Sequence, residues 1–241
     1  MSFCLLFCSQ LAATETTVFD PSRDRHIPIK IYKPSLTDNC SRTPCPVTFL
    51  NAGYRMQHTD YSFIANALNK KDYLVIAVAH ELPEDPPLSR TGNLLDTRME
   101  NWQRGAQTLI FLRNYFAKQM PNYDFNDVTL VGHSNGGDIS ALLADTEYSW
   151  IKHLITLDHR RYPLPRSHNL KSLSLRATDY PADPGVLLTR SERKSLGSCS
   201  ITIEDAKHND MSDYGEDWLK KRIVKELLGF LQNERFCESL H

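Results

Sequence analysis

The sequence predicts a single α/β domain with a mostly parallel central sheet and helices on both faces. Short apolar runs alternate with stretches of helical spacing along the chain. Residues 73–79 form a continuous apolar run, typical of a strand that is covered on both faces. The 241 residues suffice for one sizeable core, and no linker or low-complexity stretch divides them.

The first half of the chain alternates strands with helices. Residues 26–32 alternate in polarity up to Pro34, which ends the strand. A stripe of Leu109, Leu112 and Phe116 marks a long amphipathic helix. We expect strands at 26–32, 46–50 and 73–79 and helices at 61–68 and 94–118.

The second half continues the same alternation and places the functional edge. We expect strands at 128–131, 151–157, 172–175 and 200–203, a helical stretch at 138–144 and a closing helix at 218–231. This βαβ order predicts parallel strands. Ligands of such sheets bind beyond the carboxyl ends of the strands.

Residues 128–137 contain the most informative motif, VTLVGHSNGG. Here Ser134 stands between Gly132 and Gly136, where an apolar strand meets a helical stretch. Strand, Gly-x-Ser-x-Gly and helix together are typical of a nucleophile elbow, in which a strained turn exposes the serine hydroxyl. A five-residue match can arise by chance, but the flanking elements make a plain glycine turn the weaker interpretation.

A serine nucleophile needs a base to accept its proton. His208 follows the last strand and precedes the last helix, so its loop reaches the carboxyl edge, and the order Ser then His fits this architecture. His133 is next to the serine and is expected to pack or hydrogen-bond locally. Three other histidines follow strands and are weaker candidates for the base: His58, His80 and His159.

With these motifs the chain resembles an α/β-hydrolase from about residue 25 to the closing helix. Several stretches are similar to platelet-activating-factor acetylhydrolase and dienelactone-hydrolase-like esterases: LNAGY at 50–54, DYSFIANAL at 60–68, YLVIAVAHE at 73–81, the elbow, and HNDM at 208–211. Dienelactone hydrolases usually have a cysteine nucleophile, whereas this chain has Ser134, which favours ordinary ester hydrolysis. The oxyanion loop has Ala52-Gly53 where His-Gly is usual.

The resemblance offers three aspartates as the acid that orients the histidine. Asp179, in the stretch RATDYPAD, matches the family's acid turn, with Arg176 where glycine is common, and we rank it first. Asp183 fits if the loop is longer. Asp158 ends the preceding strand, where acetylhydrolase-like members place their acid. Any of the three could instead cap a turn.

The developing oxyanion needs two hydrogen-bond donors. The backbone N–H of Asn135 is the first candidate because it follows the nucleophile, and that of Tyr54 is the second. The link between residues 158 and 170 is too short for a lid, which predicts an open site for small or exposed acyl groups. Arg160 and Arg161 in this link could hold an acidic substrate group, although adjacent arginines more often solvate a loop.

The sequence thus predicts a serine esterase that forms an acyl-enzyme with a small-molecule ester and needs no metal or organic cofactor. Alternatives are a thioesterase, peptidase or polyester hydrolase on the same triad, or a non-catalytic binding protein. Net charge is −1, so nothing directs the chain to nucleic acid, and no apolar run reaches the length of a membrane span. No feature of the sequence predicts an oligomeric state.

Residues 1–15 resemble the apolar core and small-residue end of a secretory signal, although a basic start is lacking. We expect residues 16–241 to form the domain. Cys40 and Cys45 flank a short loop and could pair in an oxidising compartment. Export to the periplasm or beyond is therefore favoured over a cytoplasmic protein with free thiols.

Overall fold

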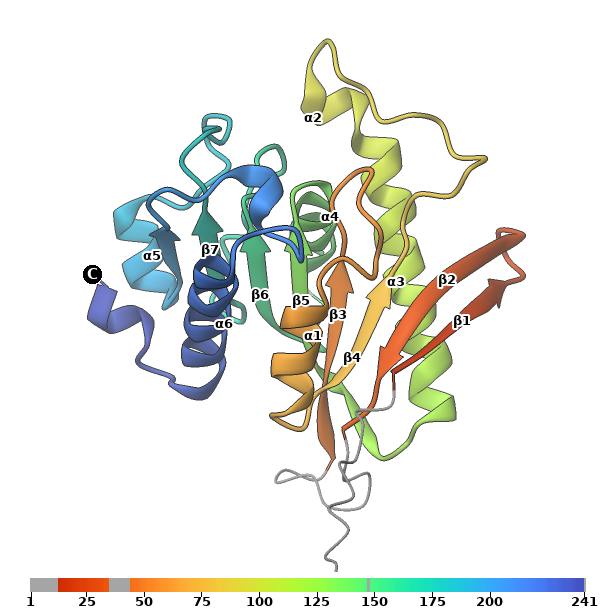
Figure 1. The fold of residues 1–241 in the computed structure, drawn as a ribbon. Coiled ribbons are helices and arrows are strands. Elements are labelled where there is room, and N and C mark those ends of the chain that lie inside the picture. The colour runs from red at the N-terminus through yellow and green to blue at the C-terminus, as the bar shows by residue number, and fades with distance from the viewer. Residues whose placement is uncertain (1–12, 35–43, 147, 241) are drawn as a thin grey trace, which may run out of the picture.

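The computed structural model describes residues 13–34, 44–146 and 148–240, which form one eight-stranded sheet flanked by helices (Figure 1). The spatial order of the strands is β1-β2-β4-β3-β5-β6-β7-β8. Their bounds are β1 Ala13–Asp20, β2 Arg25–Tyr32, β3 Cys45–Asn51, β4 Leu74–Val78, β5 Tyr123–His133, β6 Ile151–Leu157, β7 Lys171–Arg176 and β8 Cys199–Thr202.

The six strands from β4 to β8 in this order run parallel, and the pair β1–β2 and the pair β2–β4 are antiparallel. The sheet is therefore mixed and mostly parallel, as expected. Strand β1 was not predicted, because only Val18 and Asp20 of its eight residues are buried at this sheet edge. It begins at Ala13 and so overlaps the signal-like segment 1–15, whose first twelve residues lie outside the described part of the chain.

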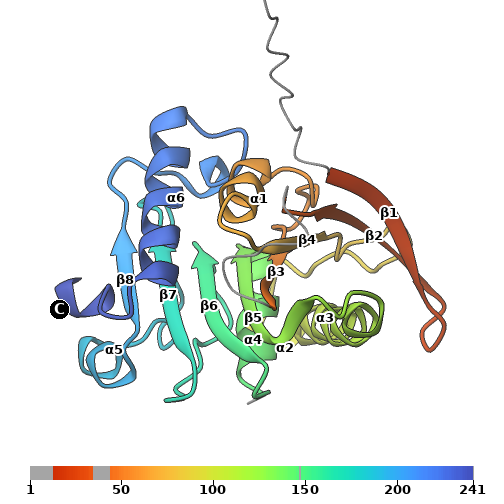
Figure 2. The ribbon, with the colours of Figure 1, turned by 90° about the horizontal axis from the view of Figure 1, so that it is seen from below.

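Helices cover both faces of the sheet (Figure 2). One face has α1 Ser62–Asn69 and α6 Asp217–Gln232, and the other has α3 Met99–Gln119, α4 Asn135–Ala144 and α5 Arg190–Leu196. Each face buries its own apolar cluster. Trp102, Leu109 and Ile139 pack on the α3–α4 side, whereas Ile64 and Ile223 pack on the α1–α6 side. Burial on both faces explains the continuous apolar run in β4.

Two helical details differ from the sequence expectation. The long helix expected at 94–118 is divided into α2 Leu94–Thr97 and α3, with Arg98 at the junction. Helix α5 was not predicted, although its capping box of Thr189 and Glu192 is a recognisable start signal. Its seven residues are mostly polar and bury only Leu196, so hydrophobic periodicity could not reveal it.

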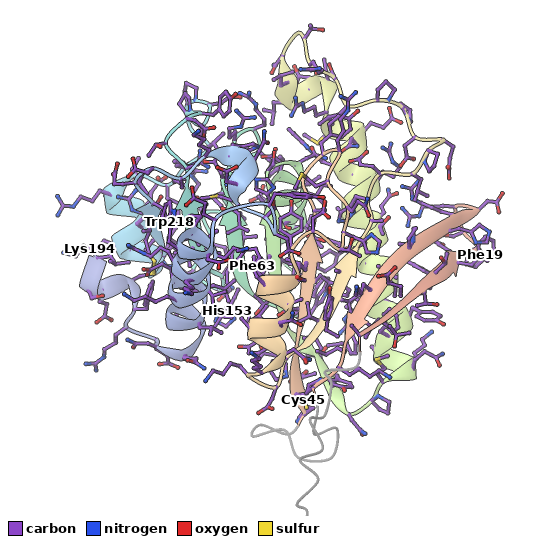
Figure 3. All side chains as sticks on the ribbon, viewed as in Figure 1. Phe19, Cys45, Phe63, His153, Lys194 and Trp218 are labelled. Carbon is purple, nitrogen blue, oxygen red and sulfur yellow. A yellow bond between two sulfur atoms is a disulfide. The ribbon has the colours of Figure 1, made fainter. Side chains whose placement is uncertain are left out.

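The two ends of the parallel strands form opposite edges of the sheet. Cys45 at the start of β3 and His153 near the start of β6 mark the lower edge in Figure 3, and the elbow lies at the opposite, carboxyl edge. The described part of the chain also contains a disulfide, which joins Cys199 in β8 to Cys237 in η2 (Cys237–Leu240). The sequence predicted a different pair, Cys40 with Cys45. Cys40 lies outside the described residues, so that pairing stays a prediction.

Candidate active site

Ser134 lies in the tight turn between β5 and α4. Its φ of 50° and ψ of −119° are rare for a residue other than glycine. A Cβ atom at Gly132 would lie 2.3 Å from the carbonyl oxygen of Gly136, and one at Gly136 would lie 2.3 Å from that of Asn51. Both positions therefore require glycine, and the turn has the strained geometry that the motif predicts.

The loop after β8 brings His208 to this serine. His208 begins the short helix η1 (His208–Asp210), and its Nε2 lies 2.9 Å from Ser134 Oγ. When Nδ1 carries the ring proton, Nε2 accepts the hydrogen bond from the Ser134 hydroxyl. The His208 side chain is 8% exposed, so the neighbours of its other nitrogen determine its orientation.

The carboxylate at that other nitrogen belongs to Asp158, whose Oδ2 lies 2.6 Å from His208 Nδ1. The structure therefore corrects the ranking that placed Asp179 first. Sheet order supplies the reason, because β6 is the direct neighbour of β5 and β7 is one strand further away. A residue directly after β6 thus lies beside the elbow. The φ of 48° at Asp158 is a further strained backbone angle in the site.

The two other candidate aspartates have positions apart from the ring nitrogens. Asp179 Oδ1 accepts a hydrogen bond from the backbone N–H of His208 at 2.8 Å, so it anchors the loop that presents the histidine. Asp183 forms an ion pair with Arg161, which also removes Arg161 from the set of free cations near the serine.

Asp158 is held as a carboxylate. Burial alone opposes its ionisation, but the hydrogen bond from His208 and the charge of Arg176 outweigh burial and keep the pKa of Asp158 below its usual range. Arg176 lies 2.7 Å from Asp158 Oδ1, and the backbone N–H of Ala177 donates to the same oxygen at 3.1 Å. An ionised partner favours a proton on His208 Nδ1 and stabilises the ring when it becomes charged.

His133 takes the structural role expected of it. Its Nδ1 lies 2.7 Å from the Tyr61 hydroxyl, and its Nε2 lies 2.9 Å from the backbone carbonyl oxygen of His208. Complete burial lowers the pKa of His133 to about 3, so the ring is neutral. His133 therefore holds the backbone of the loop that carries His208, and it does not act on Ser134 as a base.

The remaining histidine candidates also lie apart from the nucleophile. Nε2 of His80 pairs with Asn51 Oδ1 at 2.9 Å, and His159 is fully buried against Gly137. Burial lowers the pKa of each to about 3. His58 does not line the cleft that contains Ser134.

The expected oxyanion donors come from two separate segments beside the elbow. Asn135 opens α4 directly after Ser134, and Tyr54 follows Gly53 in the loop after β3. A Cβ atom at Gly53 would lie 3.3 Å from the Ser134 Cβ, so this loop packs directly on the elbow. The backbone N–H of Met56 donates to the Gly53 carbonyl oxygen and closes the turn. In the described chain, neither expected donor N–H has a hydrogen-bond acceptor.

A partly buried polar network that the sequence did not reveal fixes the Asn135 side chain. Trp102 Nε1 donates to Asn135 Oδ1 at 2.8 Å. Asn135 Nδ2 donates to Asn101 Oδ1 at 2.9 Å and to Glu81 Oε1 at 3.2 Å. Burial raises the pKa of Glu81. The only available signal was Glu81, two residues after the strand at 73–79, since Asn101 and Trp102 read as ordinary helix residues.

Ser134 and His208 open onto a cleft of about 650 Å³. Tyr54 and Asn135 line it beside them, and Tyr180 and Tyr214 are exposed side chains on its lining. The described link from β6 to β7 contains no helix, so it does not form the lid that larger hydrolases insert there. No helix of the described chain is long and apolar enough to cross a bilayer.

Comparison with known proteins identifies the fold. No family model and no curated protein matches the sequence. Among solved structures, an esterase from Rhizomucor miehei is 12% identical and aligns over 95% of this chain and 85% of its own, with a TM-score of 0.65. A dienelactone hydrolase-like promiscuous phosphotriesterase from metagenomic libraries is 14% identical over 94% and 98% of the two chains, with a TM-score of 0.64.

A third similar structure is a ferulic acid esterase from Streptomyces cinnamoneus, which is 15% identical over 88% of this chain and 78% of its own, with a TM-score of 0.61. At such low sequence identities, the similarity shows a shared fold and not a shared function. The strand order, the flanking helices and these matches together show that the chain has the α/β-hydrolase fold, with a mixed and mostly parallel eight-stranded sheet.

Proposed function

We propose that this chain is a serine hydrolase that cleaves carboxylic esters through a Ser134–His208–Asp158 triad. The observation that supports it best is the unbroken relay from Asp158 Oδ2 to His208 Nδ1 at 2.6 Å and from His208 Nε2 to Ser134 Oγ at 2.9 Å. Serine becomes nucleophilic at neutral pH only beside such an oriented base.

The reaction proceeds in two halves. His208 Nε2 accepts the Ser134 proton as Oγ attacks the ester carbonyl carbon, and the carbonyl electrons move to the oxygen. The N–H groups of Asn135 and Tyr54 stabilise that oxyanion. It collapses with cleavage of the bond to the alcohol, which takes the proton from His208. Water then attacks the acyl carbon as His208 accepts its proton. The bond between the acyl carbon and Ser134 Oγ breaks, and Oγ takes that proton from His208, which releases the acid and restores the serine.

The open cleft favours small or exposed acyl groups over long buried chains. We test this with 4-nitrophenyl esters from acetate to decanoate, and we expect kcat/KM to be highest for the short acyl chains. A matched panel of thioesters, peptide amides and polyester films separates the same triad acting as a thioesterase, a peptidase or a polyester hydrolase. If no acyl substrate in either set is cleaved and a fluorophosphonate does not label Ser134, the proposal fails in favour of a non-catalytic binding protein.

We also infer that the protein works in an oxidising compartment. The Cys199–Cys237 disulfide and the signal-like residues 1–15 support export over a cytoplasmic location. Alkylation of freshly lysed native cells, followed by mass spectrometry of the protein, should find Cys199 and Cys237 unmodified before reduction. Full alkylation of both cysteines would favour the cytoplasm.

A further inference from the structure

Unpaired positive charge surrounds the catalytic serine. Four arginines line its cleft: Arg55, Arg90, Arg98 and Arg160. They come from separate segments, because Arg55 follows Tyr54, Arg160 is two residues after Asp158, and the others lie between β4 and α3. The chain as a whole has a net charge of −1, so this concentration of positive charge is local.

Elsewhere in the fold, arginines are matched with carboxylates. Arg25 pairs with Asp85 at 2.7 Å, and Arg176 pairs with Asp158 at the same distance. By contrast, none of the four cleft arginines forms an ion pair with another described residue. Asp210 is the one acidic side chain on the described lining of the cleft, so positive charge there exceeds negative. Guanidinium groups in this state are available to a ligand.

Arg160 is held close to the reacting groups. Its guanidinium carbon lies 4.7 Å from the centre of the Tyr180 ring. That ring meets the His208 imidazole edge to face, with the two centres 5.9 Å apart. One aromatic ring therefore separates the arginine from the base, and stacking on it orients the guanidinium without using up its hydrogen-bond donors.

Arg98 approaches the same cleft from the start of α3. Its Nε donates to the Ser89 carbonyl oxygen at 2.9 Å, which leaves the two terminal nitrogens for other acceptors. One turn later, Trp102 binds the side chain of Asn135, so the start of α3 is tied to the elbow. Burial lowers the pKa of Arg98; attraction to the Asp138 carboxylate opposes this shift, and repulsion from Arg161 and Arg160 adds to it. An anion between these arginines would relieve that repulsion.

We infer, on the basis of the proposed esterase function, that the cleft selects esters bearing an anionic oxygen group, a carboxylate or a phosphate, which Arg98 and Arg160 bind. Arg55 and Arg90 add to the attractive field. Guanidinium groups suit both anions because their paired N–H donors match two oxygens at once. The anion is a fixed part of the substrate, and it positions the ester carbonyl at Ser134 Oγ.

Matched esters test the preference on each side of the scissile bond. On the acyl side, 4-nitrophenyl hydrogen succinate is compared with neutral 4-nitrophenyl pentanoate. On the alcohol side, 4-acetoxybenzoate and 4-acetoxyphenyl phosphate are compared with neutral 4-acetoxybenzamide, which separates carboxylate from phosphate. In at least one comparison we expect kcat/KM to favour the anion by roughly ten- to hundredfold, the range for charged hydrogen bonds.

Variants assign the preference to the two arginines. Arg160→Gln and Arg98→Gln should each lower the ratio of anionic to neutral kcat/KM about tenfold, and Arg160→Lys should retain part of it because the charge remains. The matched control is Arg235→Gln, an exposed arginine after α6 and outside the cleft, which should leave the ratio unchanged.

Two results would overturn the inference. One is equal or faster hydrolysis of the neutral ester in every comparison, and the other is a preference for anions that survives both glutamine substitutions. Both leave the esterase proposal intact, because the neutral esters still report turnover. Failure to cleave any ester, together with no labelling by a fluorophosphonate, would instead remove the proposed function and this inference with it.

Discussion

At the scale of single residues, the proposed triad depends on the position of one carboxylate. Asp158 is completely buried, accepts hydrogen bonds from His208 and the Ala177 N–H, forms an ion pair with Arg176, and stays ionised. Asp179 contacts only the backbone of the histidine loop and is exposed. The geometry therefore predicts unequal consequences for removing the charge at these two positions.

Asp158→Asn should reduce kcat by roughly three to four orders of magnitude, because an amide can neither fix the Nδ1–H tautomer nor stabilise the imidazolium. Asp179→Asn should reduce it less than tenfold, since its Oδ1 can still accept from the His208 N–H. Steady-state kinetics on 4-nitrophenyl acetate measure both. A larger loss for Asp179→Asn than for Asp158→Asn would contradict the assignment of the acid.

Sequence reasoning predicted Ser134 and His208 as partners but ranked Asp179 ahead of Asp158 as the acid. The two elbow glycines and the order of serine and histidine along the chain can be recognised in the sequence alone. The choice between Asp158 and Asp179 depends on which strand is the neighbour of β5, and both residues follow apolar strands. The motif comparison favoured the residue one strand too far from the elbow.

At the scale of elements, α3 and the segment after β4 hold the first turn of α4. Asn135 is fixed by Trp102 from α3 and by Glu81 from the β4 side. The same residue has one of the two N–H groups proposed for the oxyanion, so the network links the packing of α3 to the position of that N–H. Sequence periodicity predicted that α3 exists but not which of its side chains bonds to the elbow, because a buried tryptophan at helical spacing reads as core.

Trp102→Phe keeps the aromatic packing and removes the Nε1 donor to Asn135. We expect kcat to fall roughly tenfold with little change in KM, since a less well-oriented Asn135 N–H weakens transition-state binding. The buried Asn135 Oδ1 also loses its partner, at a cost of about 1–3 kcal/mol in the free energy of unfolding.

The control is Trp150→Phe, because Trp150 is also buried but packs at the start of β6, away from the elbow. It should change stability but not kcat. Equal losses of kcat in the two variants would show that general packing, not the bond to Asn135, matters for turnover.

At the scale of the whole molecule, the fold keeps several ionisable groups neutral in its interior. His80, His133 and His159 are buried, and burial lowers the pKa of each from 6.5 to about 3. Asp138 has the opposite shift, because burial raises its pKa to about 6. Stability must therefore depend on pH near neutrality, well above the range in which ordinary carboxylates titrate.

The direction of this pH dependence follows from which state of the chain, folded or unfolded, binds more protons. Below pH 6.5 the unfolded chain protonates these histidines while the folded chain does not, so stability is lost as pH falls. Between pH 7.5 and pH 5.5, each histidine lowers the free energy of unfolding by about 1.4 kcal/mol. Protonation of Asp138 in the folded protein stabilises the fold and offsets part of this loss. Urea midpoints should thus be clearly lower at pH 5.5 than at pH 7.5. An equal or higher midpoint at pH 5.5 would show that the interior histidines are protonated in the folded protein.

The central claim is that Ser134 is a nucleophile activated by His208, and covalent labelling tests it most directly. The native protein is incubated with a fluorophosphonate at pH 7.5, and intact and peptide mass spectrometry locate the adduct. We predict stoichiometric labelling on Ser134, none in Ser134→Ala, and strongly slowed labelling in His208→Ala. An unlabelled native protein, or an adduct that persists in Ser134→Ala, would contradict the claim.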